Sequence, residues 1–175
     1  MTRDDLRSLL EAHVPADAKE TADRSAMLAF LAALPAPFSA EQRKAHFTAS
    51  ALVVDADRTR TCLVLHRKLG LWLQPGGHVE PADESVGLAA LREVREETGL
   101  ETRLGTEQPV HLDIHEIPDR PDMPAHLHLD VRFLSVADAE ELTLSDESTD
   151  VRWWPLDEAA RAGDESLSRL IAAAI

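Results

Sequence analysis

The sequence predicts an α/β sandwich, in which a mixed β-sheet lies between layers of helices. Three observations support this fold class: strand-like apolar segments fill the middle of the chain, one helical segment interrupts them, and helical segments flank them at both ends. The chain has 175 residues, of which 44% are hydrophobic and 29% are charged. These values are typical of a globular protein with one domain, or with one domain and a small appendage.

The first part of the chain, residues 1–45, is predicted to be a helical extension. A first amphipathic helix is followed by a second helix over residues 18–34, which stops at Pro35. Ser39 and Gln42 then have the spacing of a capping box for a short third helical turn. No residue pattern in this extension indicates chemistry. We expect the extension to pack against the main domain, to form a lid, or to provide a homodimer contact.

The second part, residues 46–175, has the pattern of strands around one central helix. The expected strands cover residues 51–54, 61–66, 71–74, 110–117, 126–136 and 151–154. A proline-rich loop over residues 116–125 joins two of these strands as a hairpin. The central helix covers residues 84–97 and ends at Gly99, which is expected in the left-handed conformation after a helix. A final helix begins near residue 156.

The charge balance excludes several function classes. With 18 Lys and Arg against 32 Asp and Glu, the net charge is −14, which disfavours binding of nucleic acid or of an anionic membrane through a broad basic face. A phosphorylated substrate would need local positive charge, and metal ions are the obvious source. One cysteine forms no internal disulfide, and no apolar run approaches the roughly 18 residues that span a bilayer. We therefore expect a soluble, cytoplasmic protein.

Three carboxylates cluster on the central helix. At 100° per residue, Glu93, Glu96 and Glu97 fall within an arc of about 100°. Like charges at these spacings destabilise a helix by roughly 0.2–0.5 kcal/mol per pair, and a bound divalent cation would remove this repulsion. Hard oxygen ligands suit Mg²⁺ or Mn²⁺. Gly76 and Gly77 lie in a loop before the helix, where the backbone can approach a metal ion or a phosphate closely. The alternative is a solvated acidic face that binds no ion.

At these residues the sequence resembles the Nudix hydrolase family. Residues 92–100 match the second half of that family's signature, Arg-Glu-apolar-any-Glu-Glu-any-Gly-apolar, at every specified position. Glu84 lies at the family's distance before Arg92, but six residues instead of five separate it from Gly77. Asp83 has the five-residue spacing, so either acid can fill the first acidic position. The resemblance implies a Nudix-type α/β/α sandwich with a mixed sheet, preceded by the N-terminal helical extension.

The resemblance also implies an activity and a set of site residues. Nudix enzymes hydrolyse a diphosphate linkage, often in a nucleoside diphosphate derivative, with Mg²⁺ or Mn²⁺ as the cofactor. The implied metal ligands are Glu93, Glu96, Glu97 and the backbone of Gly77. Glu93 would also activate the attacking water, Arg92 would hold the carboxylates in place, and the backbone of Gly76 would cradle a phosphate. This chemistry requires charge neutralisation and a water of lowered pKa, which clustered cations provide.

Two other functions compete with this interpretation. One is an enzyme similar to isopentenyl-diphosphate isomerase, which uses a related fold and a catalytic cysteine. Cys62 lies mid-strand with no motif around it and is expected to be a buried structural residue. The other is a non-catalytic module of the same fold that binds a ligand or a protein partner. Such modules usually lose acids of the signature, and this chain keeps all three glutamates of the helix.

Further residues outside the signature are candidates for substrate binding. Trp72 and Gln74 share one face of a strand and are in position to contact a base or a sugar, although Trp72 also suits the core. Arg67 belongs to a small basic cluster that is able to reach a phosphate, or that is simply a solvated strand end. The leaving group and the base of the substrate cannot be read from these residues.

Two polar rows follow the neighbouring strands of the predicted hairpin. The rows consist of His111, Asp113 and His115 on one strand and of His126, His128 and Asp130 on the next. Because side chains alternate along a strand, each row points to one face of the sheet. We expect this face to line the substrate cleft, with His126 and His128 binding substrate, or to hold a further Zn²⁺ or Mn²⁺ ion. The alternative is a solvated surface, or a satisfied polar network beneath the N-terminal helices.

Overall fold

The computed structural model describes residues 1–119, 124–146 and 148–175. The helices in these ranges are α1 (Arg3–Ala12), α2 (Ala18–Ala33), α3 (Val86–Thr98), α4 (Leu156–Ala162) and α5 (Glu165–Ala174). The strands are β1 (Ala45–Val54), β2 (Arg60–His66), β3 (Trp72–Leu73), β4 (Gly76–His78), β5 (Thr102–Leu104), β6 (His111–Ile117), β7 (His126–Ala137) and β8 (Ser148–Pro155). None of the helices in the described ranges is long and apolar enough to cross a membrane.

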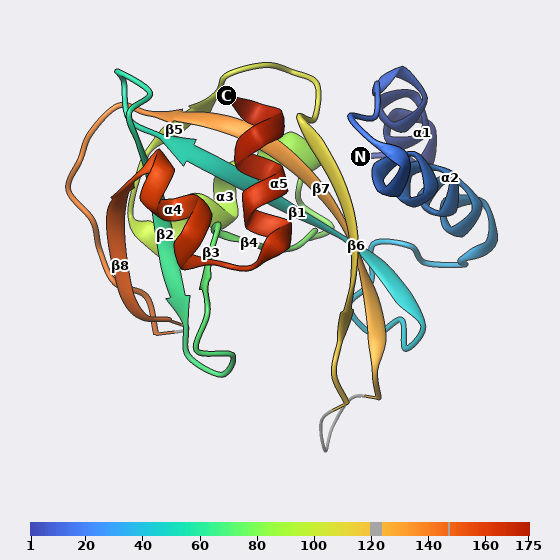
Figure 1. Cartoon of the computed structure of the whole chain (residues 1–175). Coiled ribbons are helices and arrows are strands. Elements are labelled where there is room, and N and C mark those ends of the chain that lie inside the picture. Colours follow the sequence, from blue (N-terminus) through green and yellow to red (C-terminus); the bar gives the residue numbers. More distant parts are fainter. Residues whose placement is uncertain (120–123, 147) are drawn as a thin grey trace.

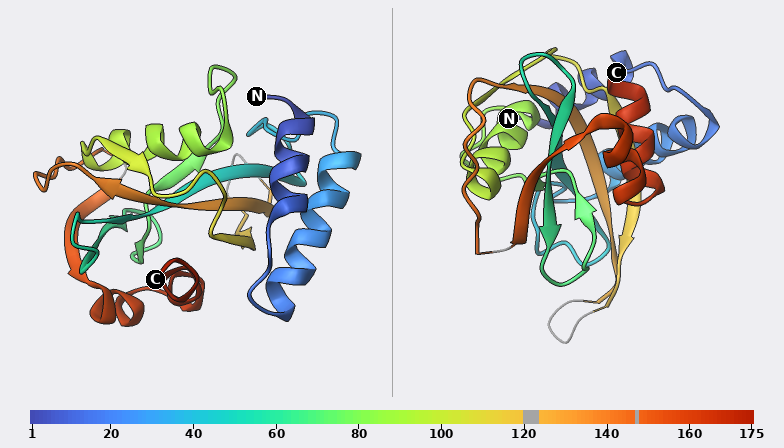
Figure 2. Two further views of the ribbon diagram at one scale, coloured as in Figure 1. Left: turned by 90° about the horizontal axis from the view of Figure 1, so that it is seen from above. Right: turned by 60° about the vertical axis from the view of Figure 1, so that its left-hand side comes forward.

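The strands form one curved, mixed sheet with helices on both sides (Figure 1). Seen from above, α3 lies on one side of the sheet and α4 and α5 lie on the other, while α1 and α2 stand together at one end (Figure 2). This arrangement confirms the predicted α/β/α sandwich with a mixed sheet and an N-terminal helical extension.

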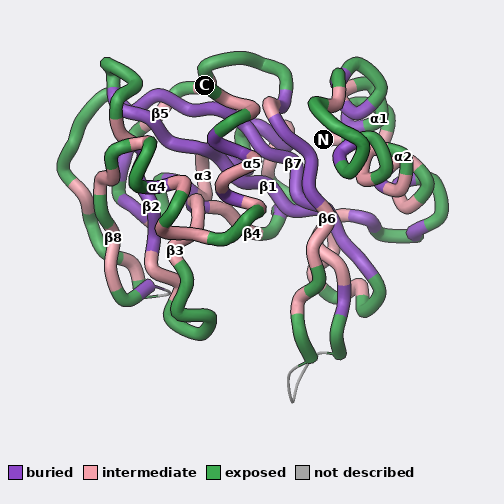
Figure 3. The backbone as a smooth tube through the Cα atoms, viewed as in Figure 1, coloured by how far each residue is buried: buried purple, intermediate pink, exposed green. Residues whose placement is uncertain are grey.

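Strand β1 is the centre of the sheet. It pairs in parallel with β7 over ten consecutive residue pairs, from Ala45 beside Leu127 to Val54 beside Val136. Its other edge is shared, because β4 pairs with the first half of β1 and β2 pairs with its end. Every residue of β1 is buried, as the continuous purple colour of this strand shows in Figure 3.

The two faces of β1 belong to different apolar clusters, because successive side chains point to opposite sides of a strand. Ala49 and Val53 pack in the cluster that contains Val94 of α3. Leu52 and Val54 pack in the cluster beneath α4 and α5. The remaining residues on this second face are polar, so the sheet leaves a polar region beside the C-terminal helices.

The N-terminal helices share the main core. The apolar residues of α1 and α2 that are buried in the same cluster as Phe47 of β1 are Leu6, Leu10, Met27 and Leu31. Helix α1 begins at a capping box in which Thr2 accepts a hydrogen bond from the backbone N–H of Asp5. This packing agrees with the first of the three roles expected for the extension.

A buried glutamate fastens α2 to β6. Glu20 is only 1% exposed, and its carboxylate accepts hydrogen bonds from the backbone N–H groups of Ala16 (2.6 Å) and Leu112 (2.8 Å). A ring nitrogen of His13 lies 2.7 Å from the same carboxylate. Burial raises the pKa of Glu20, but these hydrogen bonds outweigh it and lower the pKa overall.

Several predicted elements differ from the structure. Around Ser39 the chain makes hydrogen-bonded turns instead of a third helical turn, because the Ser39 hydroxyl accepts from Glu41 while Gln42 donates to the Ser39 carbonyl. The first strand begins at residue 45, six residues before the apolar run that predicted it. The expected final helix is two helices, since Asp164 caps a new helix at the backbone N–H of Leu167.

Two further differences concern the connections. Strand β5 was not predicted, because three residues with no distinctive alternation pair only with the edge of β7. Residues 120–123 of the predicted proline-rich loop, with Pro121 among them, lie outside the described residues. The two strands that this loop joins are antiparallel partners over seven residue pairs, as the predicted hairpin requires.

We predict that Glu20→Ala destabilises the protein by about 3 kcal/mol, because two backbone N–H groups and a histidine then lose a buried partner. Urea unfolding followed by circular dichroism measures the change. Glu11→Ala, at an exposed position of α1, is the matched control and should shift stability by less than about 0.5 kcal/mol. Equal unfolding midpoints for the two variants would contradict the role given to Glu20.

Candidate active site

Helix α3 carries the predicted acidic cluster and is fixed at both ends. The Ser85 side chain accepts a hydrogen bond from the backbone N–H of Leu88 at the start, and Gly99 adopts a left-handed φ of 74° at the end. The apolar face of the helix, with Ala90 and Val94, is buried against the sheet. The carboxylates on the other face therefore have a fixed position.

Arg92 joins this cluster together. Its guanidinium donates to Glu93 and to Glu96 at 2.9 Å each, and twice to Asp83 at 3.0 and 3.1 Å. It also donates to the backbone carbonyl of His78 at 2.8 Å. The hydrogen bonds to Asp83 are the main cause that raises the pKa of Arg92 above its ordinary value. One cation thus holds three carboxylates in place.

Of the two candidates for the first acidic position, Asp83 is the one that pairs with Arg92. The Asp83 side chain is only 7% exposed and lies against Arg92, whereas Glu84 is exposed. Burial raises the pKa of Asp83, but the hydrogen bonds from Arg92 more than compensate and lower the pKa overall. This contact favours Asp83, the acid that has the five-residue spacing from Gly77.

The two glycines lie in a strand, which corrects the prediction of a loop. Gly76 and Gly77 belong to β4 and pair with Ser50 and Ala49 of β1. A Cβ atom on Gly77 would lie 2.7–2.8 Å from the carboxylate atoms of Glu93, and the backbone N–H of Gly76 donates to Glu97 at 3.0 Å. The absence of side chains lets β4 lie directly against the carboxylates of α3.

The structure brings one of the other substrate-binding candidates to the polar face of β1. The Gln74 amide donates to the Ser50 hydroxyl at 3.4 Å. Trp72 instead packs edge-on against Trp154, with ring centroids 5.1 Å apart, beside the cluster beneath α4 and α5. This packing agrees with the core alternative for Trp72.

Arg67 has backbone partners near the start of β8. It is exposed and donates to the carbonyl of Asp146 at 3.1 Å and to that of Ser148 at 3.0 Å. These contacts fit the alternative of a strand end, in which Arg67 joins the end of β2 to the start of β8.

The two predicted polar rows lie side by side on neighbouring strands, as expected. In the β6–β7 register, Asp113 lies opposite Asp130 and His115 opposite His128. The carboxylates form a buried ion network, in which Arg132 donates to Asp130 at 2.8 Å and to Asp113 at 3.1 Å.

Helices on two sides complete this network. Lys19 of α2 donates to Asp113 at 2.7 Å, and Ser166 of α5 donates to it at 3.0 Å. Burial raises the pKa of Asp113, but hydrogen bonds from His115 and Lys19 and the charge of Arg132 lower it far below its usual range. The two aspartates of the rows therefore belong to a hydrogen-bonded polar network beneath the helices. Such a network was the alternative to a substrate cleft in the sequence analysis.

Three histidines of the rows, His115, His126 and His128, lie together with two further histidines. Their rings gather around His128, whose centroid lies 4.8 Å from that of His46, 5.3 Å from His126, 5.5 Å from His115 and 5.6 Å from His78. His46 and His78 were not connected with the rows by sequence reasoning. Only the pairing of β1 with β7 and β4 brings them there.

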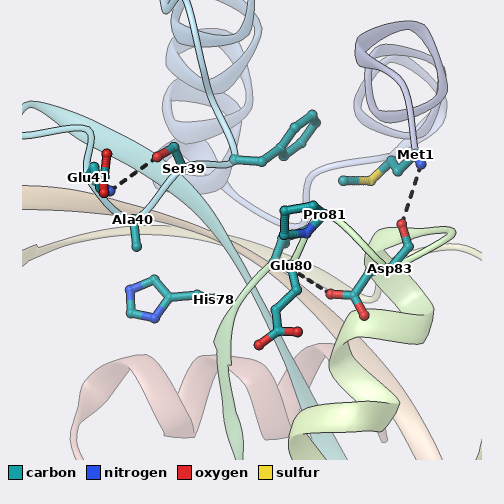
Figure 4. A pocket seen from close by; sticks show the side chains of 10 residues that line it. Met1, Ser39, Ala40, Glu41, His78, Glu80, Pro81 and Asp83 are labelled. Atoms are coloured by element: carbon teal, nitrogen blue, oxygen red, sulfur yellow. Dashed lines mark hydrogen bonds between the residues drawn. The ribbon is translucent and has the colours of Figure 1, made fainter.

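A cavity of about 730 Å³ adjoins the acidic cluster. Its walls come from the segment between β4 and α3, with His78, Glu80 and Asp83, and from the N-terminal part of the chain, with Met1 and Phe38 (Figure 4). The backbone N–H of Glu80 donates to Asp83 at 2.7 Å, and the terminal amine of Met1 donates to the carbonyl of Asp83 at 3.3 Å. The cavity therefore lies between the extension and the main domain.

The cysteine has no catalytic setting. Cys62 is fully buried in β2. Burial, together with the nearby charge of Glu97, raises the pKa of its thiol to about 12. The thiol is therefore protonated near neutral pH and is a poor nucleophile, which disfavours the isomerase-like interpretation.

The fold and the acidic cluster correspond to a known family. A profile of the NUDIX domain matches residues 44–174, and the chain belongs to this family. No curated protein matches the chain.

Solved structures of this family have similar folds. A NUDIX-family hydrolase from Clostridium perfringens is 26% identical, with a TM-score of 0.55, and the match covers 73% of this chain and 95% of that one. The NUDIX domain of Shewanella oneidensis NrtR, solved with ADP ribose, is 22% identical, with a TM-score of 0.58 and coverage of 83% and 94%. An Ap4A hydrolase from C. elegans is 17% identical, with a TM-score of 0.55 and coverage of 73% and 93%. The prediction of a Nudix hydrolase is confirmed.

We predict that Gly76→Ala destabilises the protein by about 1–3 kcal/mol, because the new Cβ would lie 2.2 Å from the Ser50 Cβ and 2.7 Å from a backbone oxygen. Gly77→Ala is the matched control for stability, since the atoms nearest its Cβ are those of the Glu93 carboxylate and not of the β1 backbone. Thermal unfolding of both variants measures the difference. The close approach of β4 to β1 would be disproved if Gly76→Ala were as stable as Gly77→Ala.

Proposed function

We propose that this Nudix hydrolase cleaves a diphosphate linkage in a nucleoside diphosphate derivative or a similar small molecule, with Mg²⁺ or Mn²⁺ as the cofactor. The observation that carries this proposal is the arrangement of the α3 carboxylates around Arg92, directly against the glycines of β4. Two structural neighbours support the substrate class, since one is a complex with ADP ribose and another is an Ap4A hydrolase.

The donor set fits a hard divalent cation. Carboxylate and carbonyl oxygens are the ligands that Mg²⁺ and Mn²⁺ prefer. The residues that would hold the ion are Glu93, Glu96, Glu97 and the backbone carbonyl of Gly77. When bound there, the ion would supply positive charge for the phosphate oxygens and lower the pKa of a water.

Three residues have proposed roles in the reaction besides binding the metal ion. Glu93 is the group best placed to accept the proton of the attacking water, because it lies between Arg92 and the backbone of β4. Arg92 is a positioning residue, which fixes the directions of the carboxylates through Asp83. Gly76 stays the proposed backbone contact of a phosphate, which would have to share the Gly76 N–H with Glu97.

Some predicted properties stay predictions. These are the cytoplasmic location, the possible homodimer, the absence of nucleic-acid partners and the division of the chain between residues 45 and 46. The non-catalytic alternative, a module that binds a ligand or partner, predicts no turnover of any diphosphate.

We predict that Glu93→Gln and Glu97→Gln each lower turnover by at least about 100-fold, as loss of a metal ligand or general base should. The substrates are a panel of nucleoside di- and triphosphates, nucleotide sugars and dinucleoside polyphosphates with Mg²⁺ or Mn²⁺, and chromatography identifies the products. Glu84→Gln, on the exposed neighbour of Asp83, is the control and should retain wild-type turnover. Near-wild-type rates for both active-site variants would rule out the mechanism.

We also predict that millimolar Mg²⁺ or Mn²⁺ raises the melting temperature of the wild-type protein, because an ion bound only to the folded state stabilises it. A Glu93→Gln, Glu97→Gln double variant should lose most of this shift. Differential scanning calorimetry measures both proteins with and without metal. An equal shift in the double variant would place the binding ion elsewhere.

A further inference from the structure

Three histidines from three strands meet on one face of the sheet, near the end where β1 and β7 begin. The parallel register puts His46 of β1 beside His128 of β7. The antiparallel register puts His78 of β4 opposite Thr48, two residues after His46. Because residues two apart along a strand share a face, the three imidazoles point to the same side.

This face is opposite to the carboxylates of α3. A Cβ on Gly77 would point at Glu93, so the next residue of β4, His78, points to the other side of the strand. Thr48 and Ser50 lie on the side of His78 as well, where both donate to Asp130. The histidine group and the acidic cluster are therefore two separate sets of donors, with β4 between them.

The distances suit a shared ion. One ligating atom from each of His46, His78 and His128 lies within 4.8 Å of the other two. A zinc ion bonds imidazole nitrogens at about 2.0–2.1 Å, so the nitrogens of a tetrahedral site lie about 3.4 Å apart. His46 is buried, His128 is half-buried and His78 is exposed, so the group of three extends from the interior to the surface.

The buried ring of His46 has an unsatisfied nitrogen. Its Nδ1 lies 3.4 Å from the backbone carbonyl of Gln42, whereas its Nε2 is buried with no hydrogen-bond partner among the described residues. A buried polar atom without a partner costs about 1–3 kcal/mol. A histidine that donates one ring N–H to a carbonyl presents the lone pair of the other nitrogen, which is the usual arrangement of a metal-bound histidine.

The surroundings of His46 and His128 favour the uncharged imidazole. Burial is the main cause that lowers the pKa of His46 to about 4 and that of His128 to about 2. The neutral imidazole is the form that binds metal ions.

We propose that His46, His78 and His128 form a binding site for a transition-metal cation of the Zn²⁺ type, distinct from the carboxylate site of α3. Three imidazoles leave a fourth position for water or another ligand, as in zinc sites that exchange ligands. Imidazole nitrogen favours Zn²⁺, whereas the oxygen donors of α3 favour Mg²⁺. The two sites therefore select different ions.

The test uses the full chain after removal of metals by a chelator. Zn²⁺ is titrated in millimolar Mg²⁺ against a chromophoric chelator, and the wild-type protein should take up one equivalent. His78→Gln and His128→Gln should each weaken this binding by at least about 100-fold, more than the loss of a residue outside the coordination sphere usually does. His66→Gln, in β2 and outside the group, is the control and should bind as the wild type does. Visible absorption of added Co²⁺ gives a second readout of a nitrogen site.

The outcomes distinguish the proposed histidine site from the proposed hydrolase mechanism. Zn²⁺ uptake that persists in the Glu93→Gln, Glu97→Gln double variant supports the histidine site independently of the hydrolase mechanism. Uptake lost in that double variant but unchanged in the histidine variants would overturn the proposal. Absence of Zn²⁺ uptake by the wild type would overturn it too. If His128→Gln fails to fold, the variant of the exposed His78 decides alone.

Discussion

The parallel pairing of β1 with β7 is the constraint on which the rest of the structure depends. Ten consecutive residue pairs fix the register of these two buried strands, so their alternating side chains are assigned to one face or the other without freedom to slip. The face with Ala49 receives α3, and α3 carries the acidic cluster. The face with His46 receives the histidines and, further along, the buried carboxylates of the rows.

The acidic cluster combines strong local order with excess negative charge. Arg92 forms ion pairs with Asp83, Glu93 and Glu96, and Glu97 accepts a hydrogen bond from the backbone N–H of Gly76 in β4. The guanidinium carries one positive charge and contacts three carboxylates, so its main effect is to orient them. Oriented carboxylate oxygens are the kind of ligand that a hard divalent cation binds. Since the Glu96 side chain is 58% exposed, the set is also accessible from solvent.

The sequence could predict contacts between residues that are close together in the chain, but not contacts between residues that are far apart in it. The spacing of Glu93, Glu96 and Glu97 placed them together because a helix brings residues three and four apart to one face. The rows on β6 and β7 were predictable for a similar reason, since a hairpin pairs neighbouring segments. His46 and His78 could not be grouped, because their meeting depends on the registers of strands far apart in the chain.

The two helices of the N-terminal extension were predictable, but its role was not, because its sequence carries no functional motif. Its contribution comes from its packing: the extension adds apolar side chains to the core, binds β6 through Glu20, and supplies Lys19 to the network around Asp113. It also forms one wall of the cavity beside Asp83, the carboxylate that holds Arg92. Residues of the extension and of the segment that precedes α3 line this cavity together. The extension is therefore structurally a part of the site's surroundings and not an independent appendage.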